Sequence, residues 1–460
     1  MKRKRTYRAA HVEQVRLEML LPLLAAGCIV ALDVAKQKFL VALATLAGEV
    51  VQVFRFEHPT ETRKFLSLVS ELSPHTAPGQ LKVAMEPTGT YGDAVRHQLV
   101  ALGVPVLMVS PKRTYDSQAL FDNVSSLHDA KSAVLVAKLC SMGLAREWTA
   151  PGPTHRGLRA LVELRGHHLA QEEQCFGRME ALLARHWPEF GRWMDTREQK
   201  SALRLLVEYP NPAQVYVERQ AVRVLLHKAS RGQLSAELIK GVTTEAGTTL
   251  GLPMTAEEEL LLRTLAQQAL GLREQAEALE AQMARLAAGD EVFDRLKPLM
   301  GTYTAAVIVT LCDPRQYAKA RQLEKACGLN LREKSSGEHL GRVRITKRGP
   351  ALARKVLYLF TLRMIHQSSV VRAWYMRRRG YTEGTKQRAV VAVMRKLVRA
   401  VFHVARGEQF DDHKLFDMRR LQLDVQDAPA PRSVKRRSAP RAIARGMKRA
   451  KVTKPALTLT

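Results

Sequence analysis

The stretch that decides the fold is CIVALDVAKQKFLVALATLAGEVVQVFRF, residues 28–56. It holds three runs rich in β-branched and aromatic residues, at 28–34, 38–45 and 50–56, with only three or four residues between consecutive runs. Runs of this length with tight connections predict three neighbouring antiparallel strands.

The pattern changes beyond these strands. A helical segment is expected at about 60–72, a β-rich run at 81–85, a second helix at 91–102 and another β-rich run at 104–109. Three antiparallel strands followed by alternating helices and strands is the order of an RNase H-like α/β domain, with a mixed sheet between helices. We predict this domain at residues 27–150, after a basic, partly helical arm at 1–26.

Residues 151–290 predict helices. One apolar stripe begins at Leu158 and continues to Trp187. A second stripe follows a capping box formed by Thr255 and Glu258. Its members alternate spacings of three and four: Leu262, Leu265, Ala269, Leu272, Ala276, Leu279, Met283 and Leu286. Such heptads predict a long helix with a coiled-coil seam, which either pairs two subunits or packs as a hairpin inside one.

A third region is expected at residues 291–417, where strong helical patterns at 351–367 and 385–406 follow a basic loop. Residues 418–460 form a basic tail, and the part from 428 onward has too few large apolar side chains to build a core. The fold class is therefore an α/β domain, a helical coiled-coil region and a helical C-terminal domain.

Charge indicates the kind of partner. Lys and Arg number 73 against 44 Asp and Glu, a net charge of +29. Ten of the basic residues lie in 428–460, which contains no acid, so the rest of the chain still carries +19. Cations that neutralise phosphates release condensed counterions, and this balance predicts a nucleic acid as partner.

The five cysteines are scattered and form no CxxC pair, which favours a reducing compartment and speaks against a disulfide framework or a zinc site. Basic residues 2–5 and the apolar stretch 19–32 imitate a signal peptide, but Glu13 and Glu18 lie between them and the stretch is too short for a membrane span. We therefore expect a cytoplasmic protein without a membrane partner, with a signal peptide as the alternative.

Three carboxylates are candidates for metal-dependent chemistry. Asp33 interrupts an apolar strand, where a carboxylate is costly unless a cation compensates it. Glu86 ends the next apolar run, and acids on neighbouring strands of such a sheet can meet at one edge to hold Mg²⁺ or Mn²⁺. Asp129, at the start of a helical segment, is the third candidate and shares a helix face with Ser132. Alternatively, Asp33 is a strand-end turn residue, and Glu86 and Asp129 only favour helix starts.

The basic loop offers a different chemistry, because Ser335 and Ser336 precede a glycine. Cations near such a serine lower its pKa and stabilise charge that develops on phosphorus. The candidate nucleic-acid-binding residues of this loop are Arg332, Lys334, Arg342, Arg344, Lys347 and Arg348. The alternative is an ordinary Ser-Gly turn in a solvated basic loop.

Five segments in order resemble the DEDD-type insertion-sequence transposases, the IS-one-ten and IS-eleven-eleven group. IVALDVAKQKF resembles the first-aspartate strand, VAMEPTGTY the glutamate motif, and DNVSSLHDAKSAVLVAKL the third acidic motif. KACGLNLREKSSG with RVRITKRGPALARKVLY is similar to the C-terminal motif, and KQRAVVAVMRKLVRAVFHVARGEQFD continues it. The resemblance covers residues 27–417.

The resemblance implies that Asp33, Glu86 and Asp129 are metal-binding catalytic acids in a RuvC-like domain, similar to that of Holliday-junction resolvases. It implies that Ser336 is a nucleophile that joins covalently to DNA. It also implies donor and target DNA and a structured guide RNA as partners, and assembly as a homo-oligomer, dimer or tetramer.

Two features depart from the family pattern. Ser132 stands where the family has its fourth acid, for which Asp122 is a candidate substitute, and residues 300–303 replace a Pro-Gly-rich turn. The first departure leaves two alternatives to an RNA-guided recombinase open. These are a resolvase-like metal nuclease, in which Ser336 is only structural, and a catalytically weakened nucleic-acid-binding relative.

Overall fold

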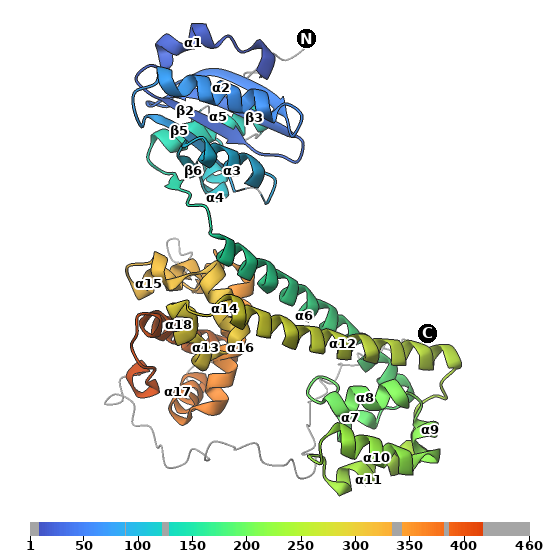
Figure 1. Ribbon diagram of the computed structural model, residues 1–460. Helices are drawn as coiled ribbons and strands as arrows, with labels where there is room; N and C mark the ends of the chain where they lie inside the picture. Colours follow the sequence, from blue (N-terminus) through green and yellow to red (C-terminus); the bar gives the residue numbers. More distant parts are fainter. Residues whose placement is uncertain (1–8, 88, 122–127, 334–342, 381–385, 417–460) are drawn as a thin grey trace, which may run out of the picture. The chain divides into compact units, whose positions relative to one another are not determined.

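The computed structural model describes residues 9–87, 89–121, 128–333, 343–380 and 386–416. The chain divides into two compact units, Met1–Gly152 and Pro153–Thr460 (Figure 1). Among the described residues, no helix is both long and apolar enough to cross a membrane.

The first unit is an α/β domain. Its strands are β1 (Ala10–His11), β2 (Cys28–Asp33), β3 (Lys38–Thr45), β4 (Val50–Glu57), β5 (Leu81–Met85), β6 (Val106–Met108) and β7 (Arg146–Glu147). Its helices are α1 (Leu17–Leu24), α2 (Thr62–His75), α3 (Asp93–Ala101), α4 (Pro111–Asp116) and α5 (Asp129–Ser141), with a short 3₁₀ turn, η1 (Val12–Gln14).

All seven strands form one mixed sheet in the order β1-β4-β3-β2-β5-β6-β7. Strands β2, β3 and β4 are antiparallel neighbours, whereas β5 lies parallel to β2 and β6 parallel to β5. Helix α5 covers one face, and α1, α2 and α3 pack against the other (Figure 1). The predicted mixed sheet with helices on both faces is confirmed.

The N-terminal region differs from the expected separate arm. Strand β1 pairs in parallel with β4 at the edge of the sheet, and α1 packs against α2. The apolar stretch that imitates a signal peptide is divided between α1 and β2. Residues 10–24 therefore belong to the α/β unit.

The second unit is mostly helical. Its helices are α6 (Pro153–His186), α7 (Phe190–Trp193), α8 (Lys200–Glu208), α9 (Pro212–Val217), α10 (Arg219–Ala229), α11 (Ala236–Glu245), α12 (Ala256–Leu286), α13 (Glu291–Met300), α14 (Thr302–Leu311), α15 (Ala320–Ala326), α16 (Ala351–Gln367), α17 (Ser369–Gly380) and α18 (Lys386–Ala405). It also has the 3₁₀ turns η2 (Ala246–Thr248), η3 (Pro314–Gln316) and η4 (Asp412–Leu415), and two strands, β8 (Leu331–Arg332) and β9 (Arg344–Ile345).

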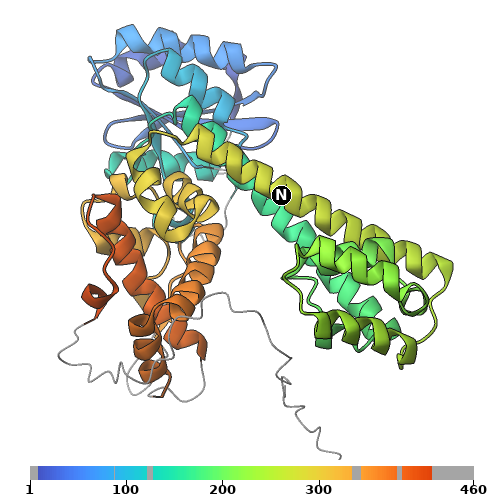
Figure 2. The ribbon, with the colours of Figure 1, turned by 60° about the horizontal axis from the view of Figure 1, so that its bottom comes forward.

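Helices α6 and α12 form a long hairpin, and they lie side by side in both views (Figures 1 and 2). The predicted capping box is present, because Thr255 accepts from the backbone N–H of Glu258 and Glu258 accepts from that of Thr255. The heptad stripe is buried at Leu262, Leu265, Ala269, Ala276, Leu279 and Met283, half-buried at Leu272 and exposed at Leu286. This stripe packs inside the chain, so the hairpin alternative describes it and the seam is not available to a second subunit.

The C-terminal helices share one core with the base of the hairpin. Helix α16 has the bounds expected for it, and α18 differs from its expected range by one residue at each end. The sequence pattern does not predict helix α17, because this segment is rich in arginine and lacks a clear apolar stripe.

Candidate active site

Asp33 and Glu86 stand at the same edge of the sheet. Strands β2 and β5 run in parallel, and Leu32 pairs with Met85. The residue that follows each member of this pair is one of the two acids. The carboxyl ends of parallel neighbours lie at the same edge, so the predicted meeting of these two acids on neighbouring strands agrees with the register.

Both acids belong to the face that α5 covers. In β2, Ile29 and Ala31 pack in the core beneath α5, and in β5 Ala84 does the same. Side chains alternate between faces with a period of two. Asp33, two residues after Ala31, and Glu86, two residues after Ala84, therefore project toward the side of α5.

Helix α5 brings the third acid. Asp129 is its first residue, and His128 precedes it as the N-cap, whose ring Nδ1 accepts from the backbone N–H of Lys131 at 3.3 Å. Alanines at 130, 133 and 137 pack on alanines of β2, β3 and β5. Such small side chains let a helix axis approach a sheet closely, which holds the helix start near the strand ends.

The three carboxylates affect one another electrostatically. The pKa of Asp33 is raised to about 7, mainly because burial disfavours the charged carboxylate, and further because the charges of Asp129 and Glu86 oppose its ionisation. Like charges in a half-buried site call for a compensating cation. Hard oxygen ligands of this kind suit Mg²⁺.

The three carboxylates nevertheless do not form a complete metal-binding site in this structure. Among the described residues, no group of three or more His, Cys, Asp or Glu side chains lies close enough together to hold a metal ion. The carboxylate oxygens and their placement fit a divalent cation. For all three carboxylates to bind one cation, they would have to move closer together. Asp122 lies outside the described residues.

Two short strands, which form a stem, flank the basic loop in the sequence. Strands β8 and β9 pair antiparallel, with Leu331 opposite Ile345 and Arg332 opposite Arg344. The predicted residues Arg332, Arg344, Lys347 and Arg348 are all exposed. Lys334, Ser335, Ser336 and Arg342 lie outside the described residues, in the segment that joins the two strands.

Hydrogen bonds join the two sides of the stem at the end next to α15. The Thr346 hydroxyl donates to the side-chain oxygen of Asn330 at 2.6 Å, and its backbone N–H donates to the Asn330 carbonyl at 2.9 Å. Gly328, with φ of +73°, follows α15, and an added Cβ there would meet the backbone of Arg348 at 2.9 Å. Strands β8 and β9 are therefore held together beside the end of α15.

Comparison with known proteins gives the family. Residues 30–188 match the model of the DEDD transposases of IS110, and residues 297–376 match the transposase family IS116/IS110/IS902. Together the matches cover more than half of the chain, and they include both the acids and the stem. The chain belongs to the DEDD-type insertion-sequence transposases.

A relative in Streptomyces coelicolor agrees with this assignment. The transposase is 26% identical over 302 residues to the insertion element IS110 uncharacterized 43.6 kDa protein of that organism. The match covers 62% of this chain and 72% of the relative. The chain is thus a DNA-acting transposase. IS110 is the IS-one-ten group that the sequence motifs resemble.

Ser132 lies on α5 one turn beyond Asp129. Ser132 is only 7% exposed, and its backbone N–H donates to the His128 carbonyl at 2.9 Å. A hydroxyl at this position carries no charge. The site therefore offers a cation less negative charge than a site with a fourth carboxylate.

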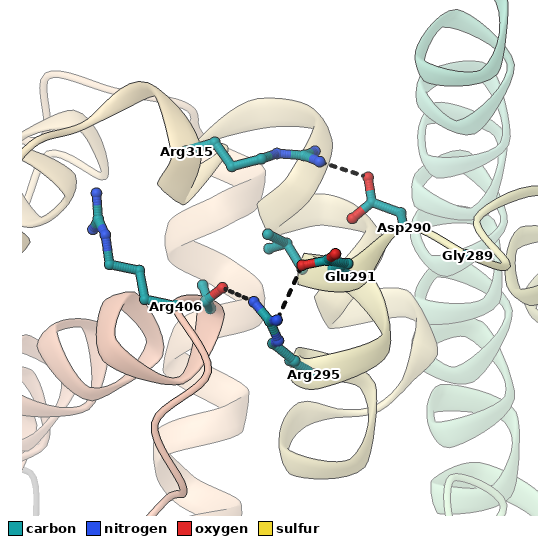
Figure 3. Close-up of a pocket in the computed structure, with 8 residues that line it drawn as sticks. Gly289, Asp290, Glu291, Arg295, Arg315 and Arg406 are labelled. Atoms are coloured by element: carbon teal, nitrogen blue, oxygen red, sulfur yellow. Dashed lines mark hydrogen bonds and ion pairs between the residues drawn. The ribbon is translucent and has the colours of Figure 1, made fainter.

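A cavity of about 660 Å³ lies elsewhere, in the helical unit beside the start of α13 (Figure 3). Three arginines line it, but Arg315 pairs with Asp290 at 2.9 Å and Arg295 with Glu291 at 3.0 Å. Arg406 donates to the carbonyl of Tyr317 at 2.8 Å. Because its cations are engaged within the protein, we assign this cavity to helix packing and not to substrate binding.

The ion pairs that join α15 to α18 are not evident from the sequence. Glu324 of α15 is 2% exposed and binds Arg395 at 2.6 Å and Arg399 at 2.7 Å, both from α18. The signal available in the sequence is a charged residue in a short helical segment just before the Gly-Leu-Asn turn. Its partners lie about 70 residues further along the chain, which no local pattern reveals.

Proposed function

We propose that this transposase inserts and excises its own element by cutting and exchanging DNA strands through a covalent serine intermediate. The proposal is supported by the parallel register that brings Asp33 and Glu86 to the same ends of β2 and β5, and by the pKa of Asp33, which burial and the charges of Asp129 and Glu86 raise to about 7. Such an electrostatic arrangement is typical of carboxylates that act with a metal cation.

In this proposal Asp33, Glu86 and Asp129 hold Mg²⁺ or Mn²⁺. The metal, when bound, supplies charge that stabilises the phosphate as it reacts. The three side chains would position that cation at the carboxyl edge of β2 and β5, where its charge would attract a DNA phosphate. Ser132 in place of a fourth acid weakens this binding without removing it.

Ser336 is the proposed nucleophile. Its hydroxyl oxygen forms a bond to a DNA phosphorus, the bond from that phosphorus to a deoxyribose oxygen breaks, and the hydroxyl proton passes to the departing oxygen. The reverse step transfers the phosphate from serine to a hydroxyl of another strand. The number of phosphoester bonds is conserved, so strand exchange needs no external energy source.

The exposed cations of the stem support a nucleic-acid partner in the same step. Arg332, Arg344, Lys347 and Arg348 are exposed in or next to β8 and β9, so phosphates could reach all four cations. By similarity to the family, a structured guide RNA selects the DNA, and a dimer or tetramer assembles both strands.

The experiment is a denaturing-gel assay for protein joined covalently to labelled donor or target DNA, with Mg²⁺ and RNA transcribed from the flanks of the element. We expect an adduct with the native chain and with Ser335→Ala, and none with Ser336→Ala. Loss of the adduct in Asp33→Ala would link acids and serine in one reaction.

Two outcomes would replace the proposal. Cleavage that persists in Ser336→Ala without an adduct identifies a resolvase-like metal nuclease, which the acid cluster alone would support. Specific binding without any cleavage identifies a catalytically weakened relative, which Ser132 would explain.

A further inference from the structure

The C-terminal helices carry an excess of cations that the proposed reaction does not use. Helices α16, α17 and α18 contain twelve Lys or Arg, three in α16, four in α17 and five in α18, and no Asp or Glu. Like charges that lie close together repel one another unless other groups or a bound anion compensate them. The cations that the protein does not compensate itself are therefore candidates for an anionic partner.

Cations in the middle of α18 have partners inside the protein. Arg395 and Arg399 bind the buried Glu324 at 2.6 and 2.7 Å. Lys396 donates to the carbonyl of Leu415 at 3.1 Å. These three cations therefore serve the packing of the helical unit.

A second group of cations lies where α17 ends and α18 begins. The two helices pack on each other, and only residues 381–385 join them, so the end of one lies close to the start of the other (Figure 1). We call the end of α17 and the start of α18 the basic tip. Its described cations are all exposed, and they are Arg377, Arg378, Arg379, Lys386 and Arg388.

Three of these cations lack a partner in the protein. Within the residues that the structure describes, no ion pair or side-chain hydrogen bond involves Arg379, Lys386 or Arg388. Phosphates that approach the basic tip would therefore meet cations that they need not detach from a carboxylate.

The position of two cations argues against a role in helix stability. Arginines in the last turn of α17 suit the negative end of its dipole, so they would be expected in any stable helix. Lys386 and Arg388 lie instead in the first turn of α18, which contains no acid. The positive end of a helix dipole disfavours cations there. A bound anion accounts for these two residues, whereas helix formation does not.

The shape of the basic tip favours double-stranded DNA. Successive residues of a helix point about 100° apart, so Arg377, Arg378 and Arg379 spread around the end of α17. The major groove of B-form DNA is about 12 Å wide and admits a helix, whose cations can then reach phosphates on both sides. The major groove of an RNA duplex is deep and narrow and does not admit one.

Single-stranded nucleic acid fits the basic tip less well. Proteins bind unpaired bases largely by stacking them on aromatic side chains. The two rings of α17, Trp374 and Tyr375, pack against the helical core, and Trp374 stacks on Phe416 with 4.9 Å between ring centroids. No aromatic side chain is exposed in the described part of the tip, so phosphates are the groups that it can bind.

We propose that the basic tip binds the phosphate backbone of double-stranded DNA. Arg379, Lys386 and Arg388 neutralise phosphates there and release the counterions condensed on them. The contact is made by residues other than the three acids and the stem. It goes beyond the proposed function, because it adds affinity for DNA of any sequence and requires neither the serine nor a metal.

Salt-dependent binding tests this. Full-length protein is titrated into a labelled DNA duplex in EDTA, so that no metal-dependent cleavage occurs, and anisotropy is followed over a series of salt concentrations. The triple variant Arg379→Gln, Lys386→Gln, Arg388→Gln should bind more weakly. Its slope of log K against log salt concentration should be smaller by about 2–3, because each lost phosphate contact contributes about 0.9.

A matched triple variant controls for net charge. Arg178→Gln with Arg204→Gln and Lys240→Gln also removes two arginines and one lysine, all exposed, from α6, α8 and α11. None of the three forms an ion pair with another described residue. Its slope should change by less than about 1. Equal falls in slope for the two triple variants would overturn the proposal, since net charge would then explain both.

Two further measurements test the chemistry of the contact. Arg379→Lys with Arg388→Lys keeps the charge and should keep the slope, and a loss of slope there would overturn binding by charge. With an RNA duplex of the same sequence the triple variant of the tip should lose less slope than with DNA, and a larger loss with RNA would overturn the assignment to DNA. Ser336→Ala should bind as the native protein does, so a failure of the serine mechanism leaves this readout unaffected.

Discussion

Arg332 of β8 lies directly opposite Arg344 of β9 across the two-stranded stem. Both side chains are exposed, and like charges directly opposite each other destabilise a strand pair. This cost is understandable if phosphates neutralise the pair when nucleic acid binds. Binding should then depend on both arginines in a measurable way.

Replacing both arginines, Arg332→Gln with Arg344→Gln, should weaken nucleic-acid binding and make it less dependent on salt. The slope of log K against log salt concentration should fall by about 1–2, because each phosphate that is no longer neutralised lowers the slope by roughly 0.7–0.9. Anisotropy titrations over a salt series measure this. The pair Arg159→Gln with Arg192→Gln removes equal charge from α6 and α7, and an equal fall in slope there would show a general effect of net charge.

The pH dependence of stability should reveal Asp33. Its folded-state pKa of about 7 lies above its ordinary value of 3.8, so the folded state holds this proton more tightly than the unfolded state. Stability from this group is therefore present at low pH and lost as the pH rises toward 7. Without metal, Asp33→Asn should be more stable than the native protein at pH 8 by roughly 1–3 kcal/mol, and equal to it near pH 4.

Thermal melts at the two pH values, with and without Mg²⁺, measure this difference. Mg²⁺ should raise the midpoint of the native protein at pH 8 more than that of Asp33→Asn, because it compensates the charge that the variant lacks. If the difference in melting midpoint between the native protein and Asp33→Asn were the same at both pH values, the pKa of Asp33 would not be raised in the folded state.

Ser132→Asp should restore metal affinity at the acidic site. The added carboxylate lies one turn from Asp129 at a position only 7% exposed, so without metal it should destabilise the fold by about 1–3 kcal/mol. Bound Mg²⁺ should reverse much of that loss. Calorimetric titration measures the affinity for Mg²⁺. Ser132→Asn is the control, because Asn has the size of Asp without its charge, and it should not bind Mg²⁺ more tightly than the native protein does.

Glu324→Gln should destabilise the helical unit strongly. Glu324 is buried whereas Arg395 and Arg399 are partly exposed, so removing the shared anion should cost about 1–3 kcal/mol. Glu291→Gln is the control, because that pair with Arg295 is exposed and should cost at most about 1 kcal/mol. Denaturant unfolding separates the two, and similar losses would show that Glu324 is not a buried anchor.

Local patterns predicted much of the fold. The three antiparallel strands, β5, α16 and the capping box of α12 all appear where their sequence patterns placed them. In each case the residues that form the element are close together in the chain. Strands β1 and β7 are two residues each, and they exist only because a neighbouring strand offers hydrogen bonds, so no local pattern could reveal them.

The sequence by itself determined the partner class, through the excess of basic residues, and the family, through five motifs in order. Only the tertiary structure decided that the heptad stripe packs inside the chain. The same apolar spacing suits a partner helix from the same chain and one from a second subunit equally well. It also decided that the charges of Asp33, Glu86 and Asp129 act on one another, because strand register and helix packing bring together residues that lie up to 96 positions apart. The distances between these acids depend on strand register and helix packing, which the spacing of the residues along the chain does not reveal.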